Sequence, residues 1–258
     1  MVNNEQRTTN NEQRTMNGTV LAIDAGNTRI KWGVHDGARW LRQAWIEAVH
    51  AAELQPALAG LPPLQGVVVS NVAGAALREV ILKALPPTPA PRWIKSERVQ
   101  CGVRNGYDDP AQLGCDRWAA LIGAHRLHGG PAVVVDAGTA LTADALTGDG
   151  VFVGGIIVPG AELMRKALAE HTAALKPQPG KFSFFPATTG DAIMSGAINA
   201  LAGAIERMAR FLEEAGQPQP ACVLSGGGAA LLEPYLNLEV KVVDNLVLEG
   251  LVTIAREG

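Results

Sequence analysis

Apolar runs and amphipathic segments alternate along this chain from residue 18 onward. A short apolar run bounded by turn residues is typical of a buried strand, and apolar residues recurring every three or four positions are typical of a helix. The pattern predicts strands at 20–24, 29–34, 66–70, 132–136, 141–145, 152–158 and 221–224. It predicts helices at 48–55, 75–85, 117–127, 161–170, 191–214 and 246–255. The chain is therefore expected to have an α/β fold.

The longest predicted helix, 191–214, carries small or apolar residues that would share one face: Ile193, Ala197, Ala200, Ala204, Met208 and Phe211. Its small residues would let another helix approach closely, within the chain or across a dimer interface. A face packed inside the monomer is the simpler expectation for any single helix of this kind.

Two segments open the two halves of the chain in nearly the same way. Asp-Ala-Gly-Asn-Thr at 24–28 and Asp-Ala-Gly-Thr at 136–139 each follow an apolar strand and lead into a second strand. One such turn is a weak signal, because these residues are ordinary in turns. Two copies in matching positions indicate a duplicated fold, with a first lobe at 18–130 and a second lobe at 131–258.

Each of these hairpins brings together the groups that hold a metal-bound polyphosphate. Its turn offers backbone N–H groups and a threonine hydroxyl to phosphate oxygens, and its aspartate can manage the cation. The order of elements, a hairpin followed by alternating strands and helices, resembles the actin, Hsp70 and sugar-kinase superfamily. That superfamily has two related lobes of ribonuclease H-like fold, with ATP in the cleft between them. A Rossmann domain is not expected, since the first strand runs into a hairpin rather than a Gly-x-Gly-x-x-Gly turn.

A third glycine-rich segment, Ser225, Gly226, Gly227 and Gly228, follows the apolar strand at 221–224. Successive glycines let the backbone pass close to a ligand. Alone the segment is an ordinary turn between a strand and a helix. Behind two phosphate-binding hairpins, it is better interpreted as a contact to the adenosine of ATP.

The segment between the two hairpins carries the candidate chemistry of the acceptor. The segment Gly114-Cys115-Asp116-Arg117-Trp118 leads into an apolar helix, so Asp116 is also expected as a helix N-cap. Arg117 is also expected as a surface charge or as a charge that bridges the two lobes. Upstream, Tyr107 lies in a turn-rich stretch, where it could simply pack against the core.

Four motifs in this order, Asp-x-Gly-Asn-Thr, Gly-x-Asp-Arg-Trp, Asp-x-Gly-Thr and Ser-Gly-Gly, resemble those of bacterial type III pantothenate kinases. The resemblance runs from Thr19 to the C-terminus. It implies an actin-like fold, a homodimer in the cytoplasm, and ATP-dependent phosphorylation of pantothenate to 4'-phosphopantothenate, the first step of coenzyme A biosynthesis.

Site residues follow from the same resemblance by position. The implied ATP-binding residues are Asp24, Ala25, Gly26, Asn27, Thr28, Arg29, Ile30, Lys31, Thr139, Ser225, Gly226 and Gly227. The implied pantothenate-binding residues are Tyr107, Gly114, Cys115, Asp116, Arg117 and Thr189, with Asp116 as the proton acceptor. The implied monovalent-cation site, for K⁺ or NH₄⁺, is Asp136.

Some of these roles have local alternatives. Asp24 is expected to hold Mg²⁺ through water, because Mg²⁺ loses its hydration shell reluctantly. Lys31 could face either the phosphates or solvent, and Thr189 could simply help to cap the helix that follows. Arg117 could pair with the pantothenate carboxylate or screen the transferred phosphoryl group.

The composition limits the classes of molecule that the protein is expected to bind. The 258 residues are 47% hydrophobic and 18% charged with a net charge of −3, which gives no reason to expect nucleic acid or an anionic membrane as a partner. The three scattered cysteines, Cys101, Cys115 and Cys222, are expected to be reduced thiols of a cytosolic protein.

Two other functions remain open from the residues alone. The same fold could serve a sugar or acetate kinase or a polyphosphate phosphatase, and those would lack the Gly-x-Asp-Arg-Trp arrangement. A non-catalytic, nucleotide-dependent accessory factor for transcription is the second alternative. The complete set of candidate catalytic residues argues against it.

The first 17 residues are expected to be a disordered tail. The sequence at 3–8 is repeated at 10–15, and nothing apolar lies between Val2 and Met16 to bury. The sequence leaves open whether translation starts at Met1 or Met16.

Overall fold

A computed structural model describes residues 18–172, 175 and 178–258 of the chain. The predicted tail at 1–17 lies outside the described residues. Within the described ranges, no helix is both long enough and apolar enough to cross a membrane.

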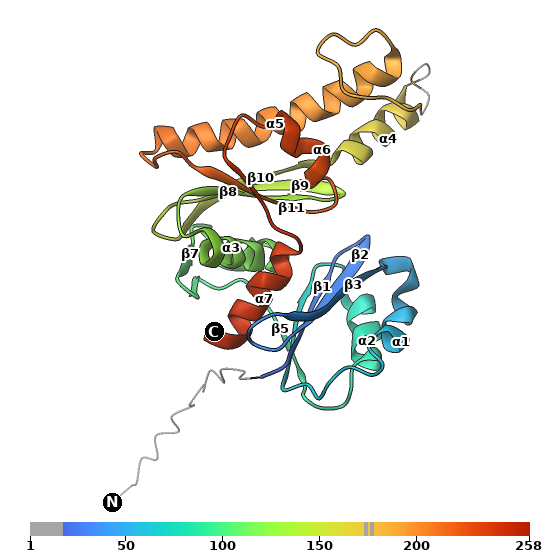
Figure 1. Cartoon of the computed structure of the whole chain (residues 1–258), viewed down its shortest axis with the longest axis vertical. Coiled ribbons are helices and arrows are strands. Elements are labelled where there is room, and N and C mark those ends of the chain that lie inside the picture. Colours follow the sequence, from blue (N-terminus) through green and yellow to red (C-terminus); the bar gives the residue numbers. More distant parts are fainter. Residues whose placement is uncertain (1–17, 173–174, 176–177) are drawn as a thin grey trace, which may run out of the picture.

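The first sheet is built around the strand that carries the first aspartate (Figure 1). Its strand order is β3-β2-β1-β4-β5, made of β1 (Val20–Ala25), β2 (Arg29–His35), β3 (Trp40–Glu47), β4 (Gly66–Asn71) and β5 (Pro91–Trp93). One face packs against η1 (Ala48–Glu53), α1 (Leu54–Ala57) and α2 (Ala75–Ala84). Leu21, Ile23, Val67 and Val69 are fully buried on this face.

The second sheet has the strand order β12-β11-β8-β9-β10-β7-β6. Its strands are β6 (Val99–Gln100), β7 (Val103–Asn105), β8 (Ala132–Ala137), β9 (Ala140–Leu146), β10 (Val151–Pro159), β11 (Ala221–Ser225) and β12 (Val240–Val242). The long helix α5 (Thr189–Glu214) lies along one face, with α4 (Ala161–His171) beside its first turns (Figure 1). The short elements η2 (Pro110–Gln112), α6 (Ala229–Leu232) and η3 (Glu233–Tyr235) lie between these longer elements in the described part of the chain.

Two helices fill the space between the sheets: α3 (Cys115–His128) and α7 (Leu246–Glu257) (Figure 1). They cross closely, because Gly250 has no side chain and a Cβ there would overlap the backbone of Ala119. Eight successive residues of α3, from Arg117 to Ala124, are buried. The start of α3 is thereby fixed in a rigid central layer.

The two halves repeat one arrangement of strands. β1 pairs with β2 antiparallel and with β4 parallel, and β8 pairs with β9 antiparallel and with β11 parallel. Asp24 is in register with Ser70 on β4, and Asp136 is in register with Ser225 on β11. The duplicated lobes predicted from the two hairpins are therefore present.

The structure differs from the sequence prediction in several elements. β3 was not predicted, because it is an edge strand whose side chains are mostly exposed. The helix predicted at 48–55 is a 3₁₀ helix followed by α1, which continues through Pro56 to Ala57. Proline is tolerated there because it falls in the first helical turn.

The predicted face of the long helix was correct only in part, because Ala197 and Met208 are buried as expected. α5 buries Ile198, Leu201, Ile205 and Leu212 against the second sheet, whereas Ala200 and Phe211 of the predicted face are exposed.

We keep the lobe boundary at residue 130 as a proposal. β6 and β7 join the second sheet, and α3 lies between the two sheets.

Candidate functional site

The tips of the two hairpins meet. The Thr28 and Thr139 hydroxyl oxygens lie 2.9 Å apart, although 111 residues separate them in sequence. In each turn the glycine N–H closes the hairpin: the Gly26 N–H donates to the Arg29 carbonyl, and the Gly138 N–H donates to the Ala140 carbonyl in a loop one residue shorter, each at 3.0 Å. The two candidate phosphate-binding turns therefore form one site.

Behind the tips, carboxylates from three elements share one electrostatic environment. Asp24 is 8% exposed, and its Oδ1 has no hydrogen-bond partner among the described residues. Burial raises the pKa of Asp24 to about 7, Lys31 works against that shift, and Asp116 and Asp136 add to it. Burial likewise raises the pKa of Asp136, opposed by Lys31 and reinforced by Asp116. The site concentrates negative charge that a cation would offset.

Lys31 belongs to this site rather than to the solvent-facing surface. It is in register with Asp24 across the first hairpin and is half-buried, and its charge lowers the pKa of both Asp24 and Asp136. The next residue, Trp32, points to the opposite face and is fully buried in the core of the first sheet. Strand alternation therefore directs the lysine toward the carboxylates.

The glycine-rich segment after β11 lies against the second hairpin. Gly226 has a φ of +93°, and a Cβ there would approach the Ala137 carbonyl oxygen to 2.6 Å and overlap Asp136 Oδ1. The Gly228 N–H donates to the Ala137 carbonyl at 2.8 Å. Only glycine allows this turn to pack so closely on the strand that carries Asp136.

The first hairpin reaches this glycine segment through Arg29. A Cβ at Gly227 would lie 3.3 Å from Arg29 Nη1. The Arg29 guanidinium lies over the Trp45 ring, 4.4 Å from its centroid. Arg29 thus bridges the two lobes beside the hairpin tips.

On the acceptor side, α3 begins where the sequence motif predicts, but its cap differs. The N-cap residue is Gly114, so the interpretation of Asp116 as the N-cap is wrong. The half-buried Asp116 carboxylate accepts a hydrogen bond from the Arg117 N–H at 2.8 Å. Cys115 Sγ lies 3.4 Å from the Ser70 hydroxyl, which ties this helix start to the strand beside Asp24.

Arg117 is buried rather than at the surface. Its Nε donates to Asp144 Oδ2 at 3.0 Å, its Nη2 donates to Asp144 Oδ1, and its Nη1 donates to the Tyr107 hydroxyl at 3.4 Å. Burial lowers the pKa of the Arg117 guanidinium, because it disfavours the charged form. The hydrogen bond and the negative charge of Asp144 raise that pKa by more, so the net shift is upward.

Sequence reasoning missed both Asp144 and Ser70. Asp144 lies within a strand that is otherwise largely apolar, and such a residue must be paired when buried. That expectation was the signal available from the sequence. Ser70 carried no comparable signal.

Thr189 is the candidate that lies apart from these contacts. It is the first residue of α5 and is exposed, and the helix is capped instead by the Thr188 hydroxyl, which accepts from the Asp191 N–H at 3.2 Å. The alternative role of Thr189 as the capping residue is therefore wrong, and its place in the site stays a prediction.

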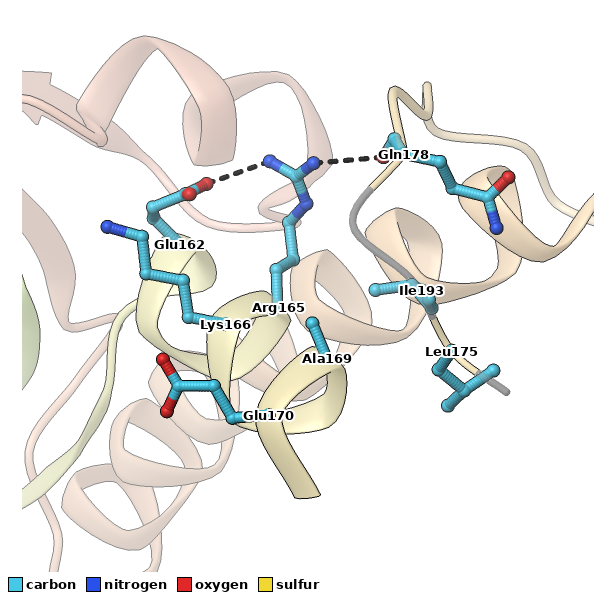
Figure 2. A pocket seen from close by; sticks show the side chains of 8 residues that line it. All are labelled: Glu162, Arg165, Lys166, Ala169, Glu170, Leu175, Gln178 and Ile193. Carbon is cyan, nitrogen blue, oxygen red and sulfur yellow. Dashed lines mark hydrogen bonds and ion pairs between the residues drawn. The ribbon is translucent and has the colours of Figure 1, made fainter. Parts of the chain in front are cut away.

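Two cavities are lined by residues of the second lobe. The larger, about 110 Å³, lies between α4 and the start of α5, where Arg165 bonds Glu162 and the Gln178 carbonyl (Figure 2). Its lining contains no predicted site residue. The smaller, about 20 Å³, lies between the second hairpin and the glycine segment and is lined by Gly138, Gly160, Leu201 and Gly228, among others.

The described residues contain no group of three His, Cys, Asp or Glu side chains that could alone enclose a metal ion. The orphaned Oδ1 of Asp24 nevertheless fits a cation held mainly by phosphate oxygens and water, as Mg²⁺ commonly is. The arrangement as a whole suits phosphoryl transfer, which depends on alignment and charge neutralisation.

Comparison with known proteins agrees with this geometry. Residues 20–210 match the family model described as type III pantothenate kinase. The chain is 50% identical over 243 residues to the type III pantothenate kinase of Nitrosospira multiformis, covering 94% of this chain and 93% of that protein.

Solved structures share the fold at low identity. A candidate Baf family transcriptional activator from Campylobacter jejuni superposes with a TM-score of 0.60 at 22% identity, covering 91% of this chain and 96% of that one. The activator of 2-hydroxyisocaproyl-CoA dehydratase from Clostridium difficile, with bound ADPNP, gives 0.50 at 12% identity and covers 92% of each chain. The predicted two-lobed, actin-like fold is confirmed.

Proposed function

This chain belongs to the type III pantothenate kinase family, and on that premise we propose how its cleft performs the reaction. The protein is a pantothenate kinase, a transferase that uses ATP to phosphorylate the alcohol group of pantothenate in coenzyme A biosynthesis. The observation that carries the proposed mechanism is the contact between Thr28 and Thr139, which joins the two phosphate-binding turns beside the start of α3.

ATP occupies the cleft between the lobes. The N–H groups and hydroxyls of the two turns hold the phosphates, Lys31 offsets their charge, and Arg29 spans to the glycine segment. Ser225, Gly226 and Gly227 lie where adenosine would pass close to the backbone. The supporting evidence is that these groups lie together: Thr28 is 2.9 Å from Thr139, Lys31 acts on both Asp24 and Asp136, and Arg29 lies beside Gly227.

Pantothenate lies on the side of α3, against Gly114, Cys115 and Tyr107. Asp116 accepts the proton of the primary hydroxyl as that oxygen attacks the γ-phosphate. The half-buried carboxylate projects from a helix start that is packed on both sides, so it orients the hydroxyl as well as accepting its proton. Thr189 stays a proposed pantothenate contact.

Two cations complete the proposed site. Asp24 would hold Mg²⁺ through water, and Asp136 would hold K⁺ or NH₄⁺. Their charge would offset that of the phosphates during transfer. The fit rests on the unpartnered Oδ1 of Asp24 and on the raised pKa of both buried carboxylates.

The cation assignment predicts a salt-specific rate. Wild-type protein should phosphorylate pantothenate in KCl or NH₄Cl and much more slowly in NaCl of equal ionic strength. Asp136→Asn should be slow in all three, because it lacks the negative charge that attracts the cation. Initial rates at saturating ATP and pantothenate test this, and equal wild-type rates in KCl and NaCl would contradict it.

We also propose that the protein is a homodimer that works in the cytoplasm. α4 has no buried residue and exposes Leu163, and α5 exposes a stripe of small residues along its outer side, Ala192, Gly196, Ala200 and Gly203. A second copy covering α4 and this stripe would bury them. The proposed location in the cytoplasm is supported by the cysteines, which are free thiols rather than disulfides. It is also supported by the use of ATP as a substrate.

The dimer is tested by a substitution that the monomer can accept. A Cβ at Gly196 meets nothing within 4 Å, so Gly196→Arg should leave the fold intact and block helix packing between copies. We expect wild-type protein to sediment at twice the mass of one chain and Gly196→Arg at the mass of one. Ala52→Arg, at an exposed position of η1, is the matched control. A monomeric wild type would refute the dimer.

The other functions considered from the sequence are not favoured. The Campylobacter protein described as a transcriptional activator shares the fold alone at its level of identity. The charges of Asp116 and Asp136 both raise the pKa of Asp24, which supports one shared site for phosphoryl transfer.

A further inference from the structure

The acceptor side of the proposed site contains a buried ion pair between Arg117 of the Gly-x-Asp-Arg-Trp motif and Asp144, which lies outside the sequence motifs. Asp144 is 1% exposed in the middle of β9, and Arg117 is 8% exposed on α3. The pair uses both carboxylate oxygens, with Arg117 Nε 3.0 Å from Asp144 Oδ2 and Nη2 bonded to Oδ1. Removing two such charges from water is unfavourable unless their geometry is good, so a purely structural pair would be a poor choice for a strand interior.

The second sheet is shaped around this pair. β10 has a register shift between Phe152 and Gly154, and Gly155 then lies opposite Asp144. A Cβ at Gly155 would overlap Asp144 Oδ1 and lie 2.8 Å from Arg117 Nη2. The glycine and the bulge therefore make room for the guanidinium beneath the loop that carries Tyr107.

The third nitrogen of the guanidinium reaches that loop. Arg117 Nη1 donates to the Tyr107 hydroxyl at 3.4 Å, and the Tyr107 ring packs against Phe152 with centroids 5.1 Å apart. The backbone of the loop is held separately by Arg98, which donates to the Tyr107 carbonyl at 2.7 Å and to the Asp108 carbonyl at 2.7 Å. The tyrosine ring and backbone are thus fixed by other groups, and its hydroxyl by Arg117.

We propose that Asp144 is a positioning residue for the acceptor: it holds Arg117 so that Arg117 orients the Tyr107 hydroxyl toward pantothenate. Because the hydroxyl oxygen accepts from Arg117, its hydrogen is free to be donated to a carbonyl or carboxylate oxygen of the substrate. Asp144 occupies two of the three guanidinium nitrogens, so Arg117 acts mainly through Tyr107 and not as the direct partner of the pantothenate carboxylate. The inference rests on the proposed placement of pantothenate beside Tyr107.

The test is a double-substitution cycle on steady-state kinetics. Asp144→Asn should raise the KM for pantothenate by roughly tenfold or more and leave the KM for ATP unchanged, as expected for the loss of a charge-assisted hydrogen bond at one substrate. Tyr107→Phe should raise the same KM. The double variant should be no worse than the more affected single variant, because both changes interrupt one chain of contacts. Asp244→Asn, at an exposed aspartate of the same lobe, should behave as wild type.

Removing one partner of a buried pair is strongly destabilising, so a second variant removes both charges. Arg117→Met with Asp144→Leu is expected to fold and to match the pantothenate KM of Tyr107→Phe. A wild-type pantothenate KM in this variant, or in folded Asp144→Asn, would overturn the inference, as would additive effects in the cycle. A wild-type protein that does not phosphorylate pantothenate would instead overturn the proposed function, and this inference with it.

Discussion

Replacing Asp116 by Asn should lower kcat for pantothenate phosphorylation by roughly 10²–10⁴-fold, the usual contribution of a general base. The amide keeps the shape of the carboxylate and can still accept the hydrogen bond from the Arg117 N–H. It cannot accept the proton of the attacking hydroxyl. The chemical step should therefore suffer while the fold of α3 is preserved.

The binding of a non-hydrolysable ATP analogue separates this prediction from a loss of structure. Asp116→Asn should bind the analogue at least as well as wild type, because it removes one of the negative charges that surround Asp24 and Asp136. Folded Asp116→Asn protein that turns over pantothenate at the wild-type rate would refute the role of Asp116 as proton acceptor.

Replacing Asp24 by Asn should separate stability from activity. The pKa of Asp24 is about 7 in the folded protein, against an ordinary value of 3.8, so the folded state binds its proton more tightly than the unfolded state does. Stability then falls as the pH rises from about 4 through about 7, because the carboxylate must be ionised while buried. Asn lacks this unfavourable ionisation, so at pH 8 the variant without ligands should be more stable, by on the order of 4 kcal/mol.

The same change should impair the enzyme. Asp24→Asn lacks the carboxylate proposed to hold Mg²⁺, so its affinity for Mg²⁺–ATP and its turnover should both fall. Thermal melts without ligand from pH 5 to pH 8 and nucleotide titrations at pH 8 provide the two readouts. A variant that is less stable than wild type at pH 8 would mean that Asp24 is not an unsatisfied buried carboxylate.

The sequence predicted the parts of this site that lie in local motifs. The seven strands expected from apolar runs are all present, and both Asp-x-Gly turns form hairpins that are closed by the glycine N–H. Those features depend on a few neighbouring residues, which is why local patterns identify them. The helix expected after the Gly-x-Asp-Arg-Trp motif is likewise present, although it begins at Cys115, two residues before the predicted start.

The parts that could not be predicted are set by contacts between distant segments. Asp144 meets Arg117 across 27 residues, and Ser70 meets Cys115 across 45. β6 and β7 are too short to register as strands, and they join the second sheet although they precede its first hairpin in sequence. The cap of α3 was misassigned because Asp is a favoured N-cap, whereas here Gly114 takes that position and Asp116 lies in the first turn of the helix.

The central claim is that the joined hairpins and the start of α3 form one site for transfer from ATP to pantothenate. It is tested most directly by incubating the purified chain with ATP, Mg²⁺ and K⁺ and a panel of acceptors, namely pantothenate, acetate, hexoses and water, and by identifying the phosphorylated product by mass. The account predicts 4'-phosphopantothenate as the product, with little transfer to the other acceptors. A folded protein that binds ATP and phosphorylates another member of the panel, or none, would contradict it.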